Sequence, residues 1–417
     1  MEIRRFPQRL FNLFNLFNFF NLFNLLTFSN FQILTCVLLS PLPLATVALA
    51  KVAPFPPFTI PAAFPLPMLL VNFKTIFITQ NPTPMSKFLI TGTAGFIGFH
   101  LANSIIAKGD DVVGLDNIND YYDVGLKYAR LADAGISRED AVSGTLVQSR
   151  KYGNYRFVKM DLEDGEGIMK LFREHKFDYV VHLAAQAGVR YSIDNPGVYI
   201  RSNVTGFFNI LEACRHNPVS FLLYASSSSV YGNNEKVPFS EDDNVDNPIS
   251  LYAATKKSNE LMASTYRHLY GIPSAGLRFF TVYGPWGRPD MAIYKFTEAI
   301  MNNRPLTVYA EGKLMRDFTY VDDITGGIMA ILGKQKQSVP PAVMNIGNHN
   351  QVSVNTLVEE LELCLGTKAL IQYLPMQPGD VNATFAEISR INAYCGFEPR
   401  TGLREGLKNF CEWYMGY

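Results

Sequence analysis

The stretch from Lys87 to Asp116 constrains the fold more strongly than any other part of the chain. It reads KFLITGTAGFIGFHLANSIIAKGDDVVGLD, which joins a short apolar run, a glycine-rich turn, a helical pattern closed by Gly109 and a second apolar run. Short apolar runs with β-branched residues are typical of buried strands, and the apolar spacing after Phe96 is typical of a helix. The stretch therefore predicts a strand, a turn, a helix and a second strand that ends on an acid.

Three glycines at spacings of three give this turn a specific chemistry. Gly92 allows the sharp exit from the strand, Gly95 lets a pyrophosphate approach the backbone, and Gly98 lets the helix pack closely. Asp116 stands where an acid accepts the ribose hydroxyls of an adenosine, which favours NAD over NADP. The alternative is a glycine-rich turn in another kind of α/β domain. The cofactor-binding residues predicted from this stretch are Gly92, Gly95, Phe96, Ile97, Gly98, Asp116 and Asn117.

Composition narrows the class of protein further. The 417 residues give room for one large or two modest domains, and 37 basic residues balance 37 acidic ones, so charge gives no reason to expect nucleic-acid binding. The five cysteines form no CxxC pair. Neither a disulfide framework nor a metal site is predicted, and a reducing compartment, the cytoplasm, fits the globular part.

Residues 1–84 differ from the rest of the chain. The segment 10–50 carries no charge, asparagine recurs there among Phe and Leu, and 51–84 is rich in proline. One interpretation is a membrane anchor, for which residues 25–50 are long enough. A signal-like segment is the second, although the apolar part is too long for one. The third is a mis-called extension, with the chain really starting at Met85. Membrane contact is expected only if the segment is real.

After Asp116 the chain alternates between strand and helix patterns, which predicts an α/β fold of the Rossmann type with a doubly wound parallel sheet. We assign residues 85–283 to an NAD-binding domain. Residues 284–417, with shorter strands and more proline, are assigned mainly to a smaller mixed substrate domain. The expected strands are 155–161, 178–182, 219–226, 273–280, 306–309 and 343–346, and the expected helices are 166–175, 195–217 and 249–270.

Tyr252 and Lys256 form a second constellation, in the sequence YAATK. A spacing of four places both side chains on one face of a helix. A tyrosine acts as a base at neutral pH only if its phenolate is stabilised by about 4 kcal/mol, and the Lys256 ammonium together with a positive nicotinamide is expected to supply this. By itself the pattern also fits a pair of surface residues. Downstream of a dinucleotide turn it favours a catalytic pair.

Four serines, Ser226 to Ser229, lie between these two motifs at the end of a predicted buried strand. Hydroxyls at the carboxyl end of a parallel strand face the cleft where ligands bind. One of them can hydrogen-bond the reacting oxygen. The alternative is a polar loop whose serines cap the following turn.

Together the glycine turn, SSSSVYG and YAATK resemble the extended short-chain dehydrogenase/reductase family of nucleotide-sugar enzymes, over residues 85–417. Further matches are HLAAQAGVR at 182–190, RFFTVYGPWGRPDMA at 278–292, RDFTYVDD at 316–323 and QPGD at 377–380. The phrase TVYGPWGRPDMA looks most like UDP-glucuronate 4-epimerases. The residues before Met85 match no part of the family.

The resemblance implies roles for individual positions. Ser227, Tyr252 and Lys256 match catalytic residues, with Ser228 as a helper on the substrate. The galactose-type epimerases usually carry Asn at the Thr281 position and Arg at the Gln377 position, so this chain departs from them. Further cofactor contacts are implied for Asp161, Leu162, Ala184, Ala185 and Gln186, and substrate contacts for Arg190, Ser228, Thr281, Arg288, Arg316 and Asp380. Arg288 suits a hexuronic carboxylate, because a guanidinium binds one through two hydrogen bonds, although it also fits a surface arginine ending a turn.

The resemblance implies C4 epimerisation of a UDP-sugar, most closely UDP-glucuronate, through a 4-keto intermediate. A UDP-glucose/galactose 4-epimerase, a dehydratase or a decarboxylase of the same family stays open, as does a non-catalytic NAD-binding scaffold. The dehydratases carry Asp-Glu after the catalytic Thr, where this chain has Ser228 and Ser229. Relatives dimerise through a four-helix bundle, so residues 193–215 and 250–270 are expected to form a homodimer interface.

Overall fold

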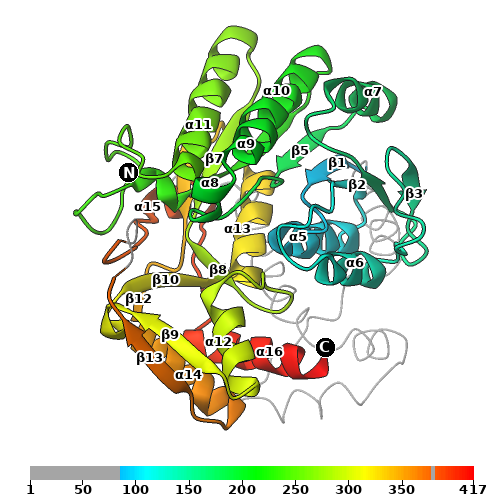
Figure 1. The fold of residues 1–417 in the computed structure, drawn as a ribbon. Helices are drawn as coiled ribbons and strands as arrows, with labels where there is room; N and C mark the ends of the chain where they lie inside the picture. Colours follow the sequence, from blue (N-terminus) through cyan, green and yellow to red (C-terminus); the bar gives the residue numbers. More distant parts are fainter. Residues whose placement is uncertain (1–84, 377–380) are drawn as a thin grey trace, which may run out of the picture. The chain divides into compact units, whose positions relative to one another are not determined.

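The structure is a computed structural model that describes residues 85–376 and 381–417, and its largest element is an eight-stranded sheet (Figure 1). The strands are β1 Lys87–Thr91, β2 Asp111–Asp116, β3 Leu146–Gln148, β4 Tyr155–Lys159, β5 Tyr179–His182, β6 Phe221–Ser227, β7 Ser274–Phe279 and β11 Val343–Ile346. They lie in the order β11-β7-β6-β5-β1-β2-β4-β3. Every neighbouring pair is parallel except β3 with β4 at the edge. The predicted parallel sheet is confirmed.

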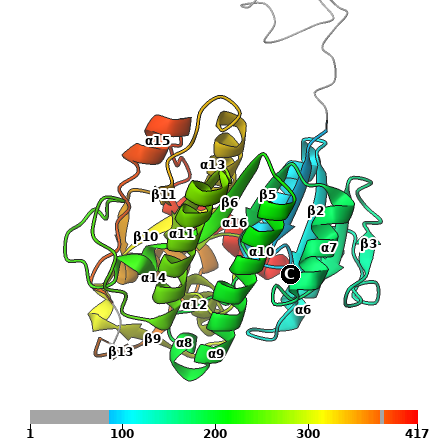
Figure 2. The same ribbon diagram turned by 90° about the horizontal axis from the view of Figure 1, so that it is seen from above.

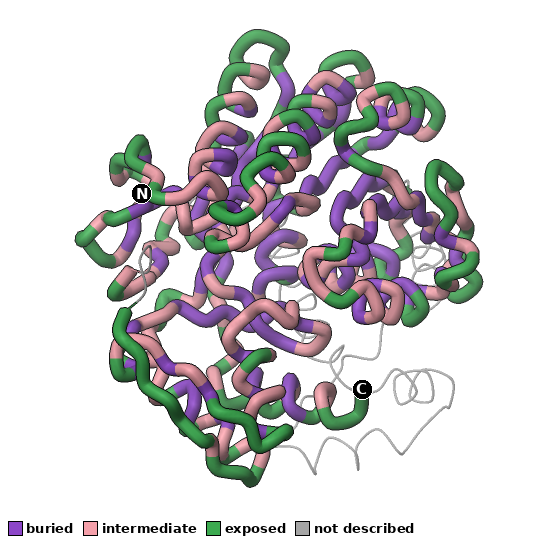
Figure 3. The backbone as a smooth tube through the Cα atoms, in the orientation of Figure 1, coloured by how far each residue is buried: buried purple, intermediate pink, exposed green. Residues whose placement is uncertain are grey.

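Helices cover both faces of this sheet, which explains why its central strands are continuous apolar runs. The cluster of buried residues on one face includes side chains of α5 Phe96–Ala107, α6 Val124–Asp133, α13 Val321–Lys334 and α15 Ser389–Cys395. The cluster on the other face includes α7 Gly165–His175, α10 Gly206–His216 and α11 Leu251–Tyr270. Figure 2 shows α10 and α11 side by side. The strands between the helices are mostly buried, and Figure 3 shows the buried residues in purple.

A smaller layer lies beyond the carboxyl ends of the large sheet. It contains the three-stranded sheet of β8 Thr281–Tyr283, β10 Met315–Tyr320 and β12 Gln351–Ser353, and the parallel pair β9 Pro305–Tyr309 and β13 Leu370–Leu374. A separate apolar cluster joins α12 Ala292–Met301, α14 Val354–Leu365 and α16 Leu403–Gly416. This is the mixed architecture expected for the substrate side.

Residues after 284 contribute to both layers. Strand β11, expected in the smaller domain, pairs in parallel with β7 and extends the large sheet. Helix α13 also returns to that sheet, where Ile324 and Ile328 are fully buried against its face. Apolar strands buried on both faces need this cover, so C-terminal residues complete the nucleotide-binding layer. The division into 85–283 and 284–417 stays an interpretation.

The long helix expected over residues 195–217 is interrupted. The chain forms α8 Tyr191–Asp194, α9 Pro196–Tyr199 and a π-helical turn, Ile200–Thr205, before α10 begins. The Asn259 side-chain amide donates to the Asn203 backbone carbonyl, within this turn, at 2.7 Å. A side chain that bonds into the helical ladder is a known cause of helix distortion, and π-turns are frequent at functional sites.

The first 84 residues, and with them the anchor, the signal-like segment and the mis-called start, lie outside the described residues. Within the described part of the chain, no helix is long and apolar enough to cross a membrane.

Candidate active site

A cavity of about 520 Å³ lies at the carboxyl ends of β1, β2, β5 and β6. Its lining continues onto the smaller layer through Thr281, Arg288 and Arg316. Ligands of open α/β sheets bind in this position, where the strand order reverses. The volume falls in the usual range for cofactor and substrate pockets.

The glycine turn forms one end of the cavity. Gly92 has a φ of +84°, and a Cβ at this residue would stand 2.9 Å from the Ala184 backbone nitrogen. A Cβ on Gly98 would stand 2.1 Å from the Gly92 carbonyl oxygen, and one on Gly95 3.0 Å from it. No side chain caps the N-terminus of α5. The turn therefore leaves backbone N–H groups at the cavity end of this helix, where phosphates bind.

Asp116 lies at the end of β2 and is 8% exposed. Its Oδ1 accepts from the Ile118 backbone N–H at 2.8 Å and its Oδ2 from the Ala94 N–H at 3.2 Å. These two bonds orient the carboxylate and leave further lone pairs for ribose hydroxyls. Asn117 is beside it in the lining, and its amide donates to the Asp161 carboxylate at 2.7 Å. Asp161 itself is exposed and is not among the lining residues.

The structure adds two polar residues to this end of the cavity that the sequence analysis missed. The Lys127 ammonium donates to the Asn119 carbonyl at 2.7 Å and to its side-chain oxygen at 2.6 Å. Asn119 in turn donates to the Gln186 side chain at 3.1 Å, which joins two loops of the lining. Burial lowers the pKa of Lys127. The only sequence signal was a lysine on the apolar face of a helix, which does not by itself indicate a site.

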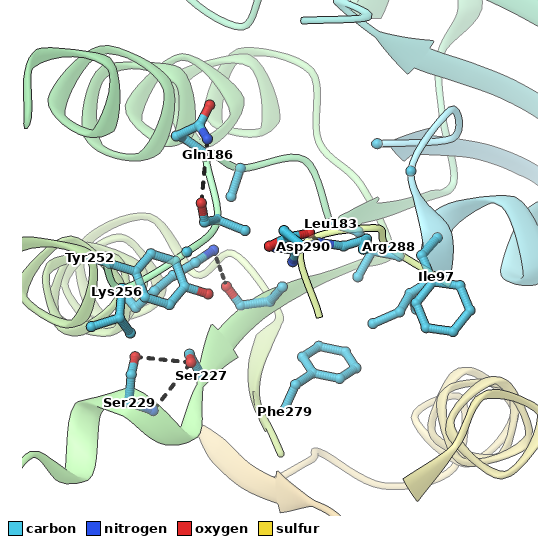
Figure 4. A pocket seen from close by; sticks show the side chains of 18 of the residues that line it. Ile97, Leu183, Gln186, Ser227, Ser229, Tyr252, Lys256, Phe279, Arg288 and Asp290 are labelled. Atoms are coloured by element: carbon cyan, nitrogen blue, oxygen red, sulfur yellow. Dashed lines mark hydrogen bonds and ion pairs between the residues drawn. The ribbon is translucent and has the colours of Figure 1, made fainter. Parts of the chain in front are cut away.

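Tyr252 and Lys256 both line the cavity from α11, as the spacing of four predicts (Figure 4). The helix begins beside them because the Ser250 hydroxyl accepts from the Ala253 N–H at 3.1 Å. The Tyr252 ring packs edge-on against Tyr199, with ring centroids 6.1 Å apart.

In the protein by itself, Lys256 is not among the groups that shift the Tyr252 pKa, and the combined effect of Lys256 and a positive nicotinamide stays a prediction. Burial raises the pKa of the Tyr252 hydroxyl above its ordinary value of 10, and only a hydrogen bond from Ser227 and the Arg288 charge oppose it. The Lys256 ammonium instead donates to the Ala225 carbonyl at 2.8 Å. Burial lowers the pKa of Lys256 to about 8, so it remains mostly charged at neutral pH.

Ser227 is the last residue of β6, next to the Tyr252 ring in Figure 4. Its Oγ accepts from the Ser229 hydroxyl at 2.9 Å and from the Ser229 N–H at 3.2 Å. Both bonds use Ser227 Oγ as an acceptor, so its own proton is left to donate, and the Ser227 side chain lowers the pKa of Tyr252 against the effect of burial. Ser228 also lines the cavity.

The residues expected on the substrate side converge at the other end of the cavity. Arg190 stacks over the Tyr309 ring at 5.4 Å, and Arg316 donates to the Val381 carbonyl at 2.9 Å. Arg288 pairs with Asp290, a residue that the sequence analysis passed over. Asp380 and Gln377 lie outside the described residues. The other lining residues that the sequence analysis named are Phe96, Ile97, Leu162, Ala184, Ala185, Gln186 and Thr281.

These features fit NAD. The uncapped helix start suits a pyrophosphate, the oriented carboxylate of Asp116 suits an adenosine ribose, and a chain of lining residues leads from there to Tyr252. The reactive end of a dinucleotide held in this way would meet the Ser227 and Tyr252 hydroxyls.

Comparison with known proteins agrees with this arrangement. Residues 88–347 match the NAD dependent epimerase/dehydratase family. Protein CapI of Staphylococcus aureus is 49% identical over 346 residues, which cover 79% of this chain and 99% of that protein. UDP-glucuronate 4-epimerase 1 of Arabidopsis thaliana is 46% identical over 345 residues, which cover 79% of this chain and 76% of that protein.

Among solved structures, the UDP-glucuronic acid 4-epimerase of Bacillus cereus in complex with UDP-glucuronic acid and NAD superposes with a TM-score of 0.71. It is 32% identical in sequence, and the match covers 79% of this chain and 100% of that one. With the glycine turn, the oriented acid and the Ser-Tyr-Lys arrangement in one cavity, these matches lead to one conclusion: the chain belongs to the NAD-dependent epimerase/dehydratase family.

Proposed function

We propose that this protein interconverts UDP-glucuronate and UDP-galacturonate by inverting the C4 centre of the sugar, with NAD held throughout the cycle. The observation that carries the proposal is that one cavity joins the glycine turn and Asp116 to the Ser227, Tyr252 and Lys256 side chains and to Arg288. The relatives named above, from Arabidopsis and Bacillus, are UDP-glucuronate 4-epimerases.

When bound, NAD supplies a reversible hydride acceptor for C4. The protein's own residues move the accompanying proton. Tyr252 takes it from the sugar 4-hydroxyl as that carbon is oxidised, and Ser227 holds the same oxygen in line by its hydrogen bond. The resulting 4-keto sugar turns in the cavity and presents the opposite face of C4 for return of the hydride, while Tyr252 returns the proton to the C4 oxygen. The hydride and the proton that the sugar loses are both returned to it, so no net oxidation occurs.

Lys256 supports this transfer electrostatically. Lys256 lies one turn after Tyr252 on α11, inside the same buried region. Its ammonium is held in place by a hydrogen bond to the backbone carbonyl of Ala225. A fixed positive charge in a site with little water stabilises the negative charge that develops on the tyrosine oxygen during proton transfer. Its contribution is therefore made in the transition state rather than in the resting protein.

The substrate-side residues divide between the parts of the nucleotide sugar. Arg190 and Arg316 are suited to the diphosphate, because guanidinium groups bind phosphate oxygens through paired hydrogen bonds. Ser228 and Thr281 offer hydroxyls to the sugar, and Arg288 offers two donors to the C5 carboxylate. Asp380 remains a predicted substrate contact. A UDP moiety held in this way leaves the hexose free to rotate.

A dehydratase or decarboxylase is less well supported, because such reactions require an acid beside the sugar. The only acids among the described lining residues are Asp116, on the cofactor side, and Asp290. Burial would raise the pKa of Asp290, but the Arg288 guanidinium outweighs this and holds that pKa below its ordinary value. Asp290 therefore stays a carboxylate and has no proton to give.

Product analysis tests the proposal and its nearest alternative. The purified protein is incubated with UDP-glucuronate and, separately, with UDP-glucose, and the nucleotide sugars are separated. We expect UDP-galacturonate from the first, at a higher rate than UDP-galactose from the second. Faster conversion of UDP-glucose would favour a UDP-glucose/galactose 4-epimerase. Recovery of a dehydrated or decarboxylated sugar would contradict epimerisation.

We further propose a homodimer formed by α10 and α11. Large apolar side chains on and beside these helices are exposed: Ile200, Phe208, Leu261 and Leu269 are between 45% and 60% exposed. Apolar residues gathered on neighbouring helices suit a four-helix interface between two copies. A cytoplasmic location, or a membrane anchor formed by residues 1–84, stays a prediction that fractionation of cells expressing the full chain would test.

A further inference from the structure

Arg288 already holds a carboxylate in this structure. Its Nε donates to Asp290 Oδ1 at 2.9 Å, and its Nη2 contacts Asp290 Oδ2. The Tyr121 hydroxyl donates to the same Oδ2 at 3.1 Å. The arginine fork and the carboxylate therefore meet through two hydrogen bonds, the geometry that an arginine uses for any carboxylate.

This group lies inside the cavity, not at its rim. Tyr121, Arg288 and Asp290 all line it, and the side chains of Arg288 and Asp290 are each about one-fifth exposed (Figure 4). Arg288 and Asp290 also act on the Tyr252 hydroxyl with opposite signs, so both lie within electrostatic reach of the reacting oxygen. The Tyr121 oxygen leaves no room for a side chain at Gly188, where a Cβ would stand 2.4 Å from it.

We propose that Asp290 is a specificity-determining residue, which occupies Arg288 as an internal counterpart of the substrate carboxylate and is exchanged for it when a uronate binds. This inference rests on the proposed function. A neutral hexose has no carboxylate to offer, so it leaves the Arg288–Asp290 pair intact. A uronate must compete with Asp290 for the same two donors.

The pair therefore limits how strongly the pocket can prefer a uronate over a neutral sugar. Without the Asp290 charge, Arg288 would be an uncompensated cation in a partly buried cavity, and an incoming carboxylate would gain the whole interaction. Tyr121 acts in the same direction as Asp290, because its hydroxyl holds the carboxylate against Arg288. Loss of that hydroxyl should loosen the pair without changing any charge.

Binding measurements separate this role from catalysis. The full chain carrying Tyr252→Phe, loaded with NAD, is titrated by calorimetry with UDP, UDP-glucose and UDP-glucuronate. Addition of Asp290→Asn should tighten UDP-glucuronate binding roughly tenfold relative to UDP-glucose, the effect of one charge-assisted interaction. Tyr121→Phe should shift the same ratio in the same direction by a smaller factor, and it provides the test if Asp290→Asn does not fold.

A matched control removes a carboxylate from another arginine fork. Glu360 accepts two hydrogen bonds from Arg404 at 2.8 Å, away from the cavity, so Glu360→Gln should leave all three affinities unchanged. Equal tightening of all three ligands in Asp290→Asn would reflect only the loss of a negative charge near the diphosphate and would overturn the proposal. An unchanged ratio would also overturn it. If the parent protein binds UDP-glucuronate no better than UDP, the proposed function itself fails, and this inference fails with it.

Discussion

At the scale of a single residue, the burial of Tyr252 opposes the ionisation that its proposed role as a base requires. Burial makes its hydroxyl harder to ionise, and the Ser227 hydrogen bond and Arg288 only partly offset this. In the proposed mechanism, Tyr252 transfers a proton best when negative charge on its oxygen is stabilised during the reaction. Its proposed role would then depend on the transition state, so the resting pKa alone would not identify it as a base.

Substitution of Tyr252 by Phe removes the only atom of this side chain that can carry the proton. We expect turnover of UDP-glucuronate to fall by roughly 10²–10⁴-fold, the usual contribution of a general acid–base group. The NAD content of the purified protein should stay near that of the parent, since the ring still fills its place beside Tyr199. Unchanged turnover would contradict the assigned role.

The pH dependence of both turnover and stability should reflect the ionisation of Lys256, whose pKa is lowered to about 8 by burial. The turnover rate should fall as pH rises through about 8, because the ammonium then loses its proton. The protein's stability should change in the opposite sense: the folded protein binds this proton more weakly than the unfolded chain, so this group favours folding as pH rises from 8 to about 10.4.

These opposite signs separate catalysis from unfolding. A rate profile measured together with the thermal midpoint at each pH checks both. Lys256→Arg keeps its charge at all these pH values, so any remaining activity should lack the fall near pH 8. If the same alkaline fall persists in this variant, another group is responsible for it.

At the scale of elements, the turn between β1 and α5 depends on backbone contacts that leave no room for side chains. Gly98→Ala would place a methyl group 2.1 Å from the Gly92 carbonyl, so the turn or the helix must move. We expect the purified variant to lose most of its bound NAD, measured by release and absorbance.

Gly333, in α13, provides the matched control for this substitution, because an added Cβ there meets no atom within 4 Å. Gly333→Ala should retain NAD and gain about 0.5–1 kcal/mol of stability from its better helix propensity. Normal NAD content in Gly98→Ala would show that the turn tolerates the methyl group.

Helix α11 is held to the sheet by a buried ion pair. The Arg278 guanidinium donates to both oxygens of Glu260 at 2.8 and 2.9 Å, and both side chains are 5% exposed or less. Ser226, the neighbour of Ser227, also donates to Glu260 at 2.7 Å. Removal of one partner leaves the other charge buried, so Arg278→Met should reduce the free energy of unfolding by about 3–5 kcal/mol in denaturant titration.

An exposed pair of similar geometry provides the comparison for Arg278→Met. Arg404 is 73% exposed and binds Glu360 through two hydrogen bonds, so Arg404→Met should cost only about 0–1 kcal/mol. Similar losses in both variants would mean that burial of the Glu260 charge has little energetic consequence.

At the scale of the whole molecule, the apolar surface of α10 and α11 is the feature that suggests a partner copy. Leu261, on α11, is 58% exposed, and Leu261→Asp would place a charge in the centre of the proposed interface. We expect sedimentation to change from dimer to monomer. Leu363 on α14 is 67% exposed outside this surface, so Leu363→Asp should leave the mass unchanged. A wild-type monomer at micromolar concentration would exclude the interface.

The sequence by itself determined the glycine turn, the acid after the second strand, the Tyr252 and Lys256 face and the parallel sheet. Each of these depends on residues close together in the chain, whose spacing is read directly as a helical or strand period. The sequence could not predict that Lys256 donates to a backbone carbonyl 31 residues away, or that β11 pairs with β7.

Only the tertiary structure decided which charged residues are buried and what they contact. Arg130 is fully buried because its guanidinium donates to Ala94 beside the glycine turn and to the Trp286 carbonyl 156 residues later. The pairing of Arg288 with Asp290 inside the cavity was equally invisible, since a spacing of two residues predicts no contact in a loop. The reason is physical: a local pattern reports which surface a residue prefers, whereas the free energy of a buried charge depends on partners that only the folded chain brings together.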